Sequence, residues 1–228
     1  SSDLAAGHRY DVGGGNRAID GLYLLRQRAE CAEGYLQSVG LGLVAFRMET
    51  RVYSWGDGRP WHSYAAYCRR HFGGRVRKIA VDAGLSCPNR DGTIGSEGCT
   101  FCDNRAFTPS YCSPRKSLTR QIDEGIAFHA ARGRDEGLCL VYFQPFSNTH
   151  APVARLRELY AEALAHPRIS GLVIGTRPDC VDDEKLDLLA ELARKRYVAV
   201  EYGVESTCDE TLRAVRRGHD FAAARQAI

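Results

Sequence analysis

Apolar and polar residues alternate in blocks from residue 61 to the end of the chain. Short, nearly continuous apolar runs predict buried strands at residues 76–83, 138–143, 169–175 and 197–204. Longer segments with helical periodicity predict helices at residues 61–72, 117–131, 152–165, 182–196 and 209–217, and another that begins at 221. Apolar strands separated by helices are typical of a parallel sheet covered by helices. The pattern therefore predicts an α/β fold.

Residues at the ends of these segments support the predicted helices. Ser117 is a favourable N-cap, and Pro152 suits the first position of a helix. Gly73 follows the first helix, where a left-handed cap is common. Acidic residues open the segment 182–196 and basic residues close it, as the helix dipole favours.

Residues 1–47 lack this regular rhythm. They contain three consecutive glycines and no lysine, and the only methionine of the chain is Met48. We interpret residues 1–47 as an N-terminal extension, with the hypothesis that it is not native and that translation starts at Met48. The core then covers residues 48–228.

The bulk composition is that of a globular protein, with 26% charged residues and a net charge of +3. No apolar run reaches the roughly 18–20 residues of a membrane helix, and we expect no secretion signal, because residues 1–47 lack a charged region followed by an apolar one. We expect a cytoplasmic protein with no membrane partner. The mild charge permits an RNA partner without indicating one. The nine cysteines are odd in number and irregularly spaced, which favours reduced thiols over a disulfide framework.

Polar residues follow each predicted strand. A cysteine-rich loop follows the first strand, and residues 144–150 follow the second. Residues 176–180 follow the third, and Glu201 and Glu205 accompany the fourth. Because the carboxyl ends of parallel strands meet at one edge of the sheet, we expect these groups to form one site.

Cys87, Cys99 and Cys102 are the strongest chemical signal in this loop. Three thiolates with the last two at C-x2-C spacing form a ligand set for a metal or an iron–sulfur cluster. Three ligands would leave one iron of a [4Fe–4S] cluster open for a substrate or cofactor. The alternative is a structural zinc site with Cys112 or a histidine as fourth ligand. Zinc knuckles usually have two C-x2-C pairs, and only one is present here.

These residues resemble the radical S-adenosylmethionine (SAM) enzymes. The nearest subgroup is a poorly characterised bacterial one, related to the radical domain of the elongator catalytic subunit. The resemblance spans about residues 52–228, although C-x11-C-x2-C is the subgroup's spacing and not the commoner C-x3-C-x2-C. It is carried by Cys87-Pro-Asn-Arg-Asp-Gly-Thr, Gly98-Cys99-Thr-Phe-Cys102, Tyr142-Phe-Gln144, Asn148-Thr149, Gly175-Thr-Arg-Pro-Asp-Cys180 and Arg217-Gly-His-Asp220.

The resemblance implies a partial (β/α) barrel of the radical SAM type. About four of the six βα units of that barrel are present, so it implies a fragment that is truncated at its C-terminus. By resemblance, the three cysteines hold a [4Fe–4S] cluster whose open iron binds SAM. Reductive cleavage would then give a 5′-deoxyadenosyl radical, with a flavodoxin-type or ferredoxin-type protein as electron donor. RNA, including tRNA, is the favoured substrate class. The alternatives are chemistry on a small metabolite and a catalytically inactive, metal-binding structural protein.

The resemblance also suggests residues that contact SAM. Phe101 would lie near the adenine, with simple packing as the alternative. Gln144 or Thr149 would contact the amino group. Arg177 and Asp179 would contact the ribose or the carboxylate, the alternative being a helix-entry turn with a surface ion pair.

Three further residues carry predictions near the fourth strand. Glu205 matches a polar SAM contact, and Arg217 matches an arginine that reaches the SAM carboxylate. A solvated helix end is the alternative for Arg217. Glu201 is expected to face the barrel interior with Arg177 or Arg217 as its partner, because a buried carboxylate needs one.

Overall fold

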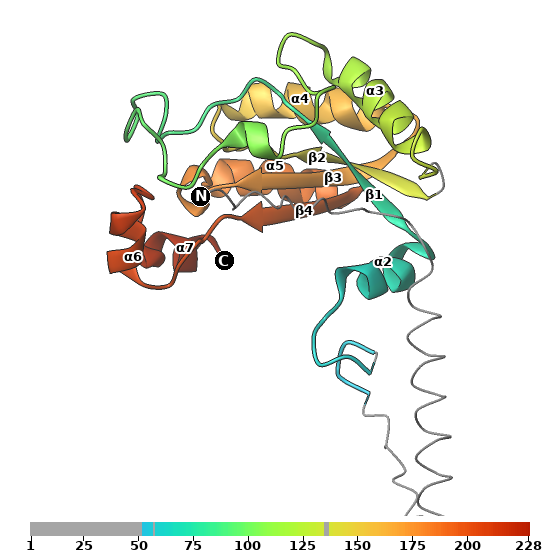
Figure 1. Cartoon of the computed structure of the whole chain (residues 1–228), viewed down its shortest axis with the longest axis horizontal. Helices are drawn as coiled ribbons and strands as arrows, with labels where there is room; N and C mark the ends of the chain where they lie inside the picture. The colour runs from blue at the N-terminus through green and yellow to red at the C-terminus, as the bar shows by residue number, and fades with distance from the viewer. Residues whose placement is uncertain (1–51, 57, 135–136) are drawn as a thin grey trace, which may run out of the picture. The chain divides into compact units, whose positions relative to one another are not determined.

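The computed structural model describes residues 52–56, 58–134 and 137–228, so the predicted extension at residues 1–47 lies outside the described residues. Four parallel strands form one sheet in the order β1-β2-β3-β4 (Figure 1). Each strand therefore pairs with the next one along the chain, which confirms the predicted α/β fold with four βα units. The strands are β1 (Val76–Val81), β2 (Leu138–Phe143), β3 (Ile169–Thr176) and β4 (Tyr197–Tyr202).

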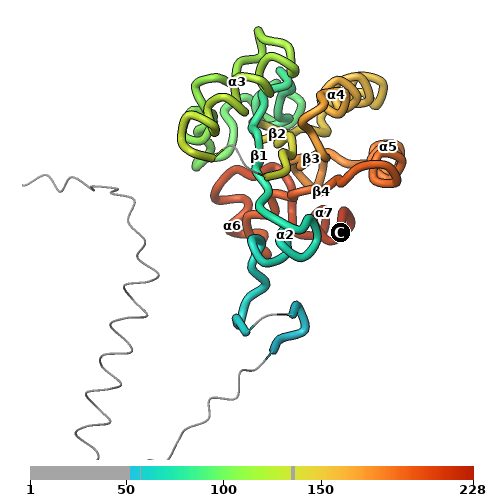
Figure 2. The backbone as a smooth tube through the Cα atoms, turned by 90° about the vertical axis from the view of Figure 1, so that its right-hand side faces the viewer, coloured from blue at the N-terminus to red at the C-terminus, as the bar shows by residue number. Residues whose placement is uncertain are grey.

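Helices cover the outer side of this sheet, as Figure 2 shows for α3, α4 and α5. No helix of the described residues has the length and apolar character that a bilayer span requires. The longer helices are α2 (Tyr64–Phe72), α3 (Leu118–Ala130), α4 (Val153–Ala165) and α5 (Asp183–Ala193). The shorter ones are α6 (Asp209–Ala214) and α7 (Phe221–Ala227), with 3₁₀ turns η1 (Asn104–Ala106) and η2 (Pro178–Cys180).

The core lies between the sheet and these outer helices. Ile79 and Phe143 from the strands are fully buried there, together with Ile122 of α3 and Leu156 of α4. Cys139 of β2 belongs to the same cluster. Burial of such side chains contributes roughly 1.5–3 kcal/mol each, which fixes the helices on this face.

Capping groups set the helix ends, and several ends differ from the predictions, including that of α5, which ends at Ala193 and not at residue 196. Helix α2 begins at Tyr64 because the Ser63 hydroxyl accepts the N–H of Ala66. Pro152 is the N-cap of α4 and not its first residue. Helix α6 ends at Ala214, and Arg216 takes a left-handed φ of 57°. The predicted N-cap Ser117 accepts the N–H of Arg120, as expected.

The inner side of the sheet carries a polar cluster that reveals its curvature. β1 and β4 are the outermost strands, and three strand spacings would separate them by about 14 Å in a flat sheet. The Lys78 ammonium of β1 nevertheless pairs with Glu201 of β4. The same ammonium lies 4.6 Å from the ring centre of Tyr142 and 5.2 Å from that of Tyr64. The sheet is therefore curved around these side chains, as in a partial barrel.

Candidate functional site

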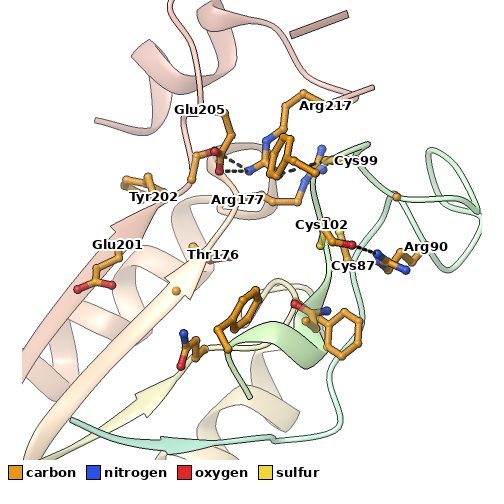
Figure 3. A pocket seen from close by; sticks show the side chains of 18 of the residues that line it. Cys87, Arg90, Cys99, Cys102, Thr176, Arg177, Glu201, Tyr202, Glu205 and Arg217 are labelled. Atoms are coloured by element: carbon orange, nitrogen blue, oxygen red, sulfur yellow. Dashed lines mark hydrogen bonds and ion pairs between the residues drawn. The ribbon is translucent and has the colours of Figure 1, made fainter. Parts of the chain in front are cut away.

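A cavity of about 400 Å³ lies at the carboxyl ends of the strands (Figure 3). Residues from the loops after all four strands line it, as the strand-end pattern predicted. Cys87, Cys99 and Cys102 lie together on one side, and Glu201 and Tyr202 lie on the far side. Parallel βα units gather their functional groups at this edge.

The loop that carries Cys87 is held in shape by hydrogen bonds within its own backbone. The carbonyl of Cys87 accepts the N–H groups of Arg90 and Asp91, at 2.7 and 3.1 Å. Asp91 is braced by Thr93 and by His150, and the hydrogen bond from Thr93 lowers the pKa of the Asp91 carboxyl. Backbone contacts of Arg90 and side-chain contacts of Asp91 therefore brace this loop.

Gly98 allows the second half of the loop to close. Its φ is +78°, and a Cβ at this position would come within 2.9 Å of the Arg90 guanidinium. In the space left free, Arg90 donates to the carbonyl of Cys102 at 2.8 Å. A residue with a side chain at position 98 would displace Arg90 and the Cys102 backbone with it.

Three phenylalanine side chains that line the cavity are solvent-exposed: Phe101 (53%), Phe107 (43%) and Phe146 (38%). Exposed aromatic rings at a cavity offer faces on which a flat heterocycle can stack. Phe101 thus lines the cavity with an exposed ring, which its packing alternative would bury, and its contact with adenine stays a prediction. The sequence analysis missed Phe107 and Phe146, which follow no motif, and Phe146 has a positive φ of 66°.

The loop after β2 places Gln144 on the cavity and Thr149 behind it. Gln144 lines the cavity, whereas Thr149 is fully buried. The Thr149 hydroxyl donates to the carbonyl of Cys180 at 2.7 Å and accepts from Thr176 at 2.6 Å. Thr176 itself lines the cavity, so Thr149 reaches the site only through this neighbour. Asn148 holds the loop by donating to the carbonyls of residues 143, 145 and 175.

Arg177 has an unusual setting on this cavity. Its side chain is only 2% exposed, and it donates to both carboxylate oxygens of Asp179, at 2.9 and 2.8 Å. Burial works to lower the pKa of Arg177, but the Asp179 carboxylate and the thiol of Cys87 outweigh it and raise that pKa. The third nitrogen, Nη1, is buried without a partner in the described structure.

The structure decides between the two features that the alternative for Arg177 and Asp179 combined, the surface ion pair and the helix-entry turn. The Arg177–Asp179 pair is buried, so the surface ion pair suggested for it is wrong. The helix-entry turn suggested with it is present as η2. A buried guanidinium N–H with no acceptor is costly, because it lost water without gaining a partner. Since Arg177 lines the cavity, an acceptor bound there would satisfy it.

The segment after β4 completes the far wall. Glu205 adopts a left-handed φ of 67°, and its carboxylate lies 3.9 Å from the Arg217 guanidinium. Arg217 is 7% exposed, so the solvated helix end proposed as its alternative is wrong. Glu201 faces the inside of the curved sheet as expected, but its partner is Lys78, and not Arg177 or Arg217.

Lys78 is a functional candidate that the sequence analysis did not single out, and it lies against Tyr142, which entered there only as part of the motif Tyr142-Phe-Gln144. Tyr142 lines the cavity, and Lys78 stands between its ring and Glu201. The usable signal was a lysine in a strand whose other residues, apart from Arg77, are apolar. Because β1 alternates its faces, Lys78 must point away from the core residues Ile79 and Val81.

The donor set fits an iron–sulfur cluster better than a single ion. In the described parts of the chain, no three His, Cys, Asp or Glu side chains stand close enough together to hold one metal ion. Cysteines that lie on one side of a cavity but too far apart for a single ion suit a cluster, because a cubane separates its ligating sulfurs more widely than one ion does. Thiolates are the ligands that iron–sulfur clusters take. Cys112 lies elsewhere, with its Sγ donating to the carbonyl of Ala80 at 3.1 Å.

Comparison with known proteins decides the family. The family profile described as Radical SAM superfamily matches residues 90–228. The chain belongs to the radical SAM superfamily. Members of this superfamily in general use a [4Fe–4S] cluster and SAM. The match contains Cys99 and Cys102 and begins just after Cys87.

Three bacterial and archaeal relatives carry names that assign no activity. The chain is 40% identical over 168 residues to the uncharacterized protein YtqA of Bacillus subtilis, covering 72% of this chain and 50% of that protein. It is 43% identical over 154 residues to protein YhcC of Escherichia coli, covering 67% and 48%. It is 36% identical over 174 residues to the uncharacterized protein MJ0486 of Methanocaldococcus jannaschii, covering 75% and 52%. The chain thus spans about half the length of these relatives.

Proposed function

We propose that this radical SAM chain is an enzyme that binds a [4Fe–4S] cluster through Cys87, Cys99 and Cys102. One observation carries the proposal: the three cysteines line the same cavity as Arg177, whose Nη1 is buried without a hydrogen-bond partner in the described part of the chain. When bound, a reduced cluster would supply one electron to SAM, whose carbon–sulfur bond would break to give methionine and a 5′-deoxyadenosyl radical able to take a hydrogen atom from a substrate.

The remaining side chains are proposed to hold SAM. Phe101 offers an exposed ring for the adenine. Gln144 supplies an amide to the amino group, and the free Nη1 of Arg177 donates to the carboxylate or ribose. Glu205 and Arg217 contact SAM from the wall after β4.

Thr149 and Asp179 are proposed to act indirectly. Thr149 holds Thr176, which lines the cavity. Asp179 fixes the guanidinium of Arg177 by hydrogen bonds from Nε and Nη2, and Nη1 stays without a protein partner among the described residues. Positioning by a bidentate carboxylate is stronger than by a single hydrogen bond.

The substrate class and setting are proposed by analogy. RNA, including tRNA, is proposed from the resemblance to the elongator-related subgroup, with a small metabolite as the alternative. The electron donor is proposed to be a flavodoxin-type or ferredoxin-type protein, and the location the cytoplasm. RNA that copurifies with the protein, and whose binding weakens steeply as salt rises, supports RNA. Binding that does not depend on salt contradicts it.

The decisive experiment is anaerobic reconstitution with iron and sulfide, followed by dithionite and SAM. We expect a brown protein that releases 5′-deoxyadenosine. Cys99→Ala should lose most of the iron, because one of three cluster ligands is removed. The matched control is Cys112→Ala, which leaves the cavity untouched and should load iron normally. Iron content that is unchanged in Cys99→Ala contradicts the ligand assignment, and a colourless zinc protein supports the structural alternative.

A further inference from the structure

Cys99 differs from the other two cysteines in what touches its sulfur. Asn89 Nδ2 lies 3.4 Å from Cys99 Sγ, and Arg217 Nη1 lies 3.6 Å from it. Both distances suit an N–H donating to a large sulfur atom. Among the hydrogen bonds of residues 52–56, 58–134 and 137–228, no side-chain N–H donates to the sulfur of Cys87 or Cys102. Two donors therefore converge on a single cysteine.

Asn89 is fixed in place by the turn that follows α6. Its side chain is 4% exposed, and its amide also donates to the carbonyls of Arg216 and Arg217, at 2.8 and 2.9 Å. Gly218 has a φ of +80°, and a Cβ there would collide with Asn89 Oδ1. The amide nitrogen is thus held against Cys99 by packing as well as by hydrogen bonds.

Arg217 is fixed in the same way from the other side. Its Nε donates to the imidazole of His219 at 3.0 Å, and its Nη2 donates to the carbonyl of Gly203. A Cβ at Gly203 would come within 2.8 Å of Nη2, so the glycine leaves the room that the guanidinium fills. Nη1 is the nitrogen that reaches the sulfur of Cys99. The side chain is 8% exposed, so its positive charge is poorly screened by water.

We propose that Asn89 and Arg217 are positioning residues that raise the reduction potential of the cluster bound by Cys99. The inference rests on the proposed function, because it needs the cluster. The step is a one-electron reduction, in which the donor protein loses one electron, the cluster gains it and no bond changes. The reduced cluster carries one more negative charge. Hydrogen bonds to a ligand sulfur and a nearby positive charge favour that form.

The test is a redox titration of the reconstituted full chain without SAM. The electron paramagnetic resonance signal of the reduced cluster measures how much of the cluster is reduced at each potential. Arg217→Met should lower the equilibrium constant for reduction about tenfold, about 59 mV for one electron. Arg216→Met is the matched control. It removes the same charge from the adjacent residue, which is 54% exposed and pairs with Glu97. Its potential should match that of the unaltered chain.

The outcomes separate this inference from the proposed function. Arg217→Lys keeps the charge but loses the reach, so we expect an intermediate potential. If Arg217→Met does not load a cluster, Asn89→Ser provides the second test. The reduction potential of the cluster in Asn89→Ser should also be lower than in the unaltered chain. Potentials that stay unchanged in variants that carry a cluster overturn this inference alone. A failure of the unaltered chain to assemble any cluster overturns the proposed function, and this inference with it.

Discussion

Arg177 shows how one residue can be required by both the fold and the site. Its guanidinium is almost completely buried, and its charge is balanced by one carboxylate, that of Asp179. A buried ion pair adds little net stability, because each charge lost its water. The loss of one partner is costly, because the other charge stays behind uncompensated. Asp179 therefore holds the guanidinium in one orientation, as the proposed contact with a bound ligand requires.

Asp179→Asn tests this view of the pair. The change leaves the Arg177 charge buried without its counter-ion, so we expect the free energy of unfolding to fall by about 3–5 kcal/mol. Chemical denaturation followed by circular dichroism measures it. Asp187→Asn, an exposed position in α5, is the matched control and should change stability by less than about 0.5 kcal/mol. A similar small effect in Asp179→Asn would show that water reaches the guanidinium.

At the scale of elements, α3 is held unusually close to β1, just ahead of the cysteine loop. Gln121 of α3 is fully buried, and its side-chain amide exchanges hydrogen bonds with the N–H and the carbonyl of Asp82, at 2.8 and 2.9 Å. Gly125 lies one turn later, and a Cβ there would come within 2.5 Å of Ile79 and 3.0 Å of Tyr111. The helix thus sets where the chain leaves β1 and enters the loop.

Gly125→Ala puts two effects in opposition. Alanine is favoured over glycine inside a helix by about 1 kcal/mol. Overpacking against a strand that cannot move costs about 1–3 kcal/mol. We expect the second effect to win and the thermal midpoint to fall. The control Thr119→Ala, exposed on the same helix, has no such contact and should leave the midpoint unchanged or slightly higher. A more stable Gly125→Ala variant would mean that α3 can shift away from β1.

At the scale of the molecule, the Lys78–Glu201 pair reports the curvature of the whole sheet. It joins the first and last strands, which do not pair with each other in the described part of the chain. Lys78 also lies against two tyrosine rings, one from α2 and one from β2. The inner side of the partial barrel therefore carries polar side chains that contact one another across the sheet. They lie directly below the cavity that Tyr142 and Glu201 line.

A double-mutant cycle with Lys78→Met and Glu201→Gln measures this connection. The two side chains are 28% and 44% exposed, so screening by solvent limits the coupling to about 0.2–1 kcal/mol. The coupling should shrink as salt rises. Arg157 and Glu191, which join the adjacent helices α4 and α5, give a matched pair for comparison. The absence of coupling between Lys78 and Glu201 at low salt would contradict the curvature inferred from their contact.

The sequence alone determined the strand and helix order, because continuous apolar runs and 3.6-residue periodicity are local properties. It also indicated the cysteine set and the edge of the sheet where polar groups gather, since parallel strands leave few alternatives. Helix ends were less accurate, because a cap such as Ser63 or a left-handed residue such as Arg216 decides them locally.

Only the tertiary structure decided which side chains meet. Lys78 and Glu201 are 123 positions apart, and Asn89 and Arg217 approach Cys99 from different segments. Such pairs depend on the curvature of the sheet and on glycines that leave room for a neighbour, neither of which is encoded in a local pattern. The tertiary structure also distinguished Gln144 from Thr149, although both belong to the same short loop. Gln144 lines the cavity, whereas Thr149 is fully buried.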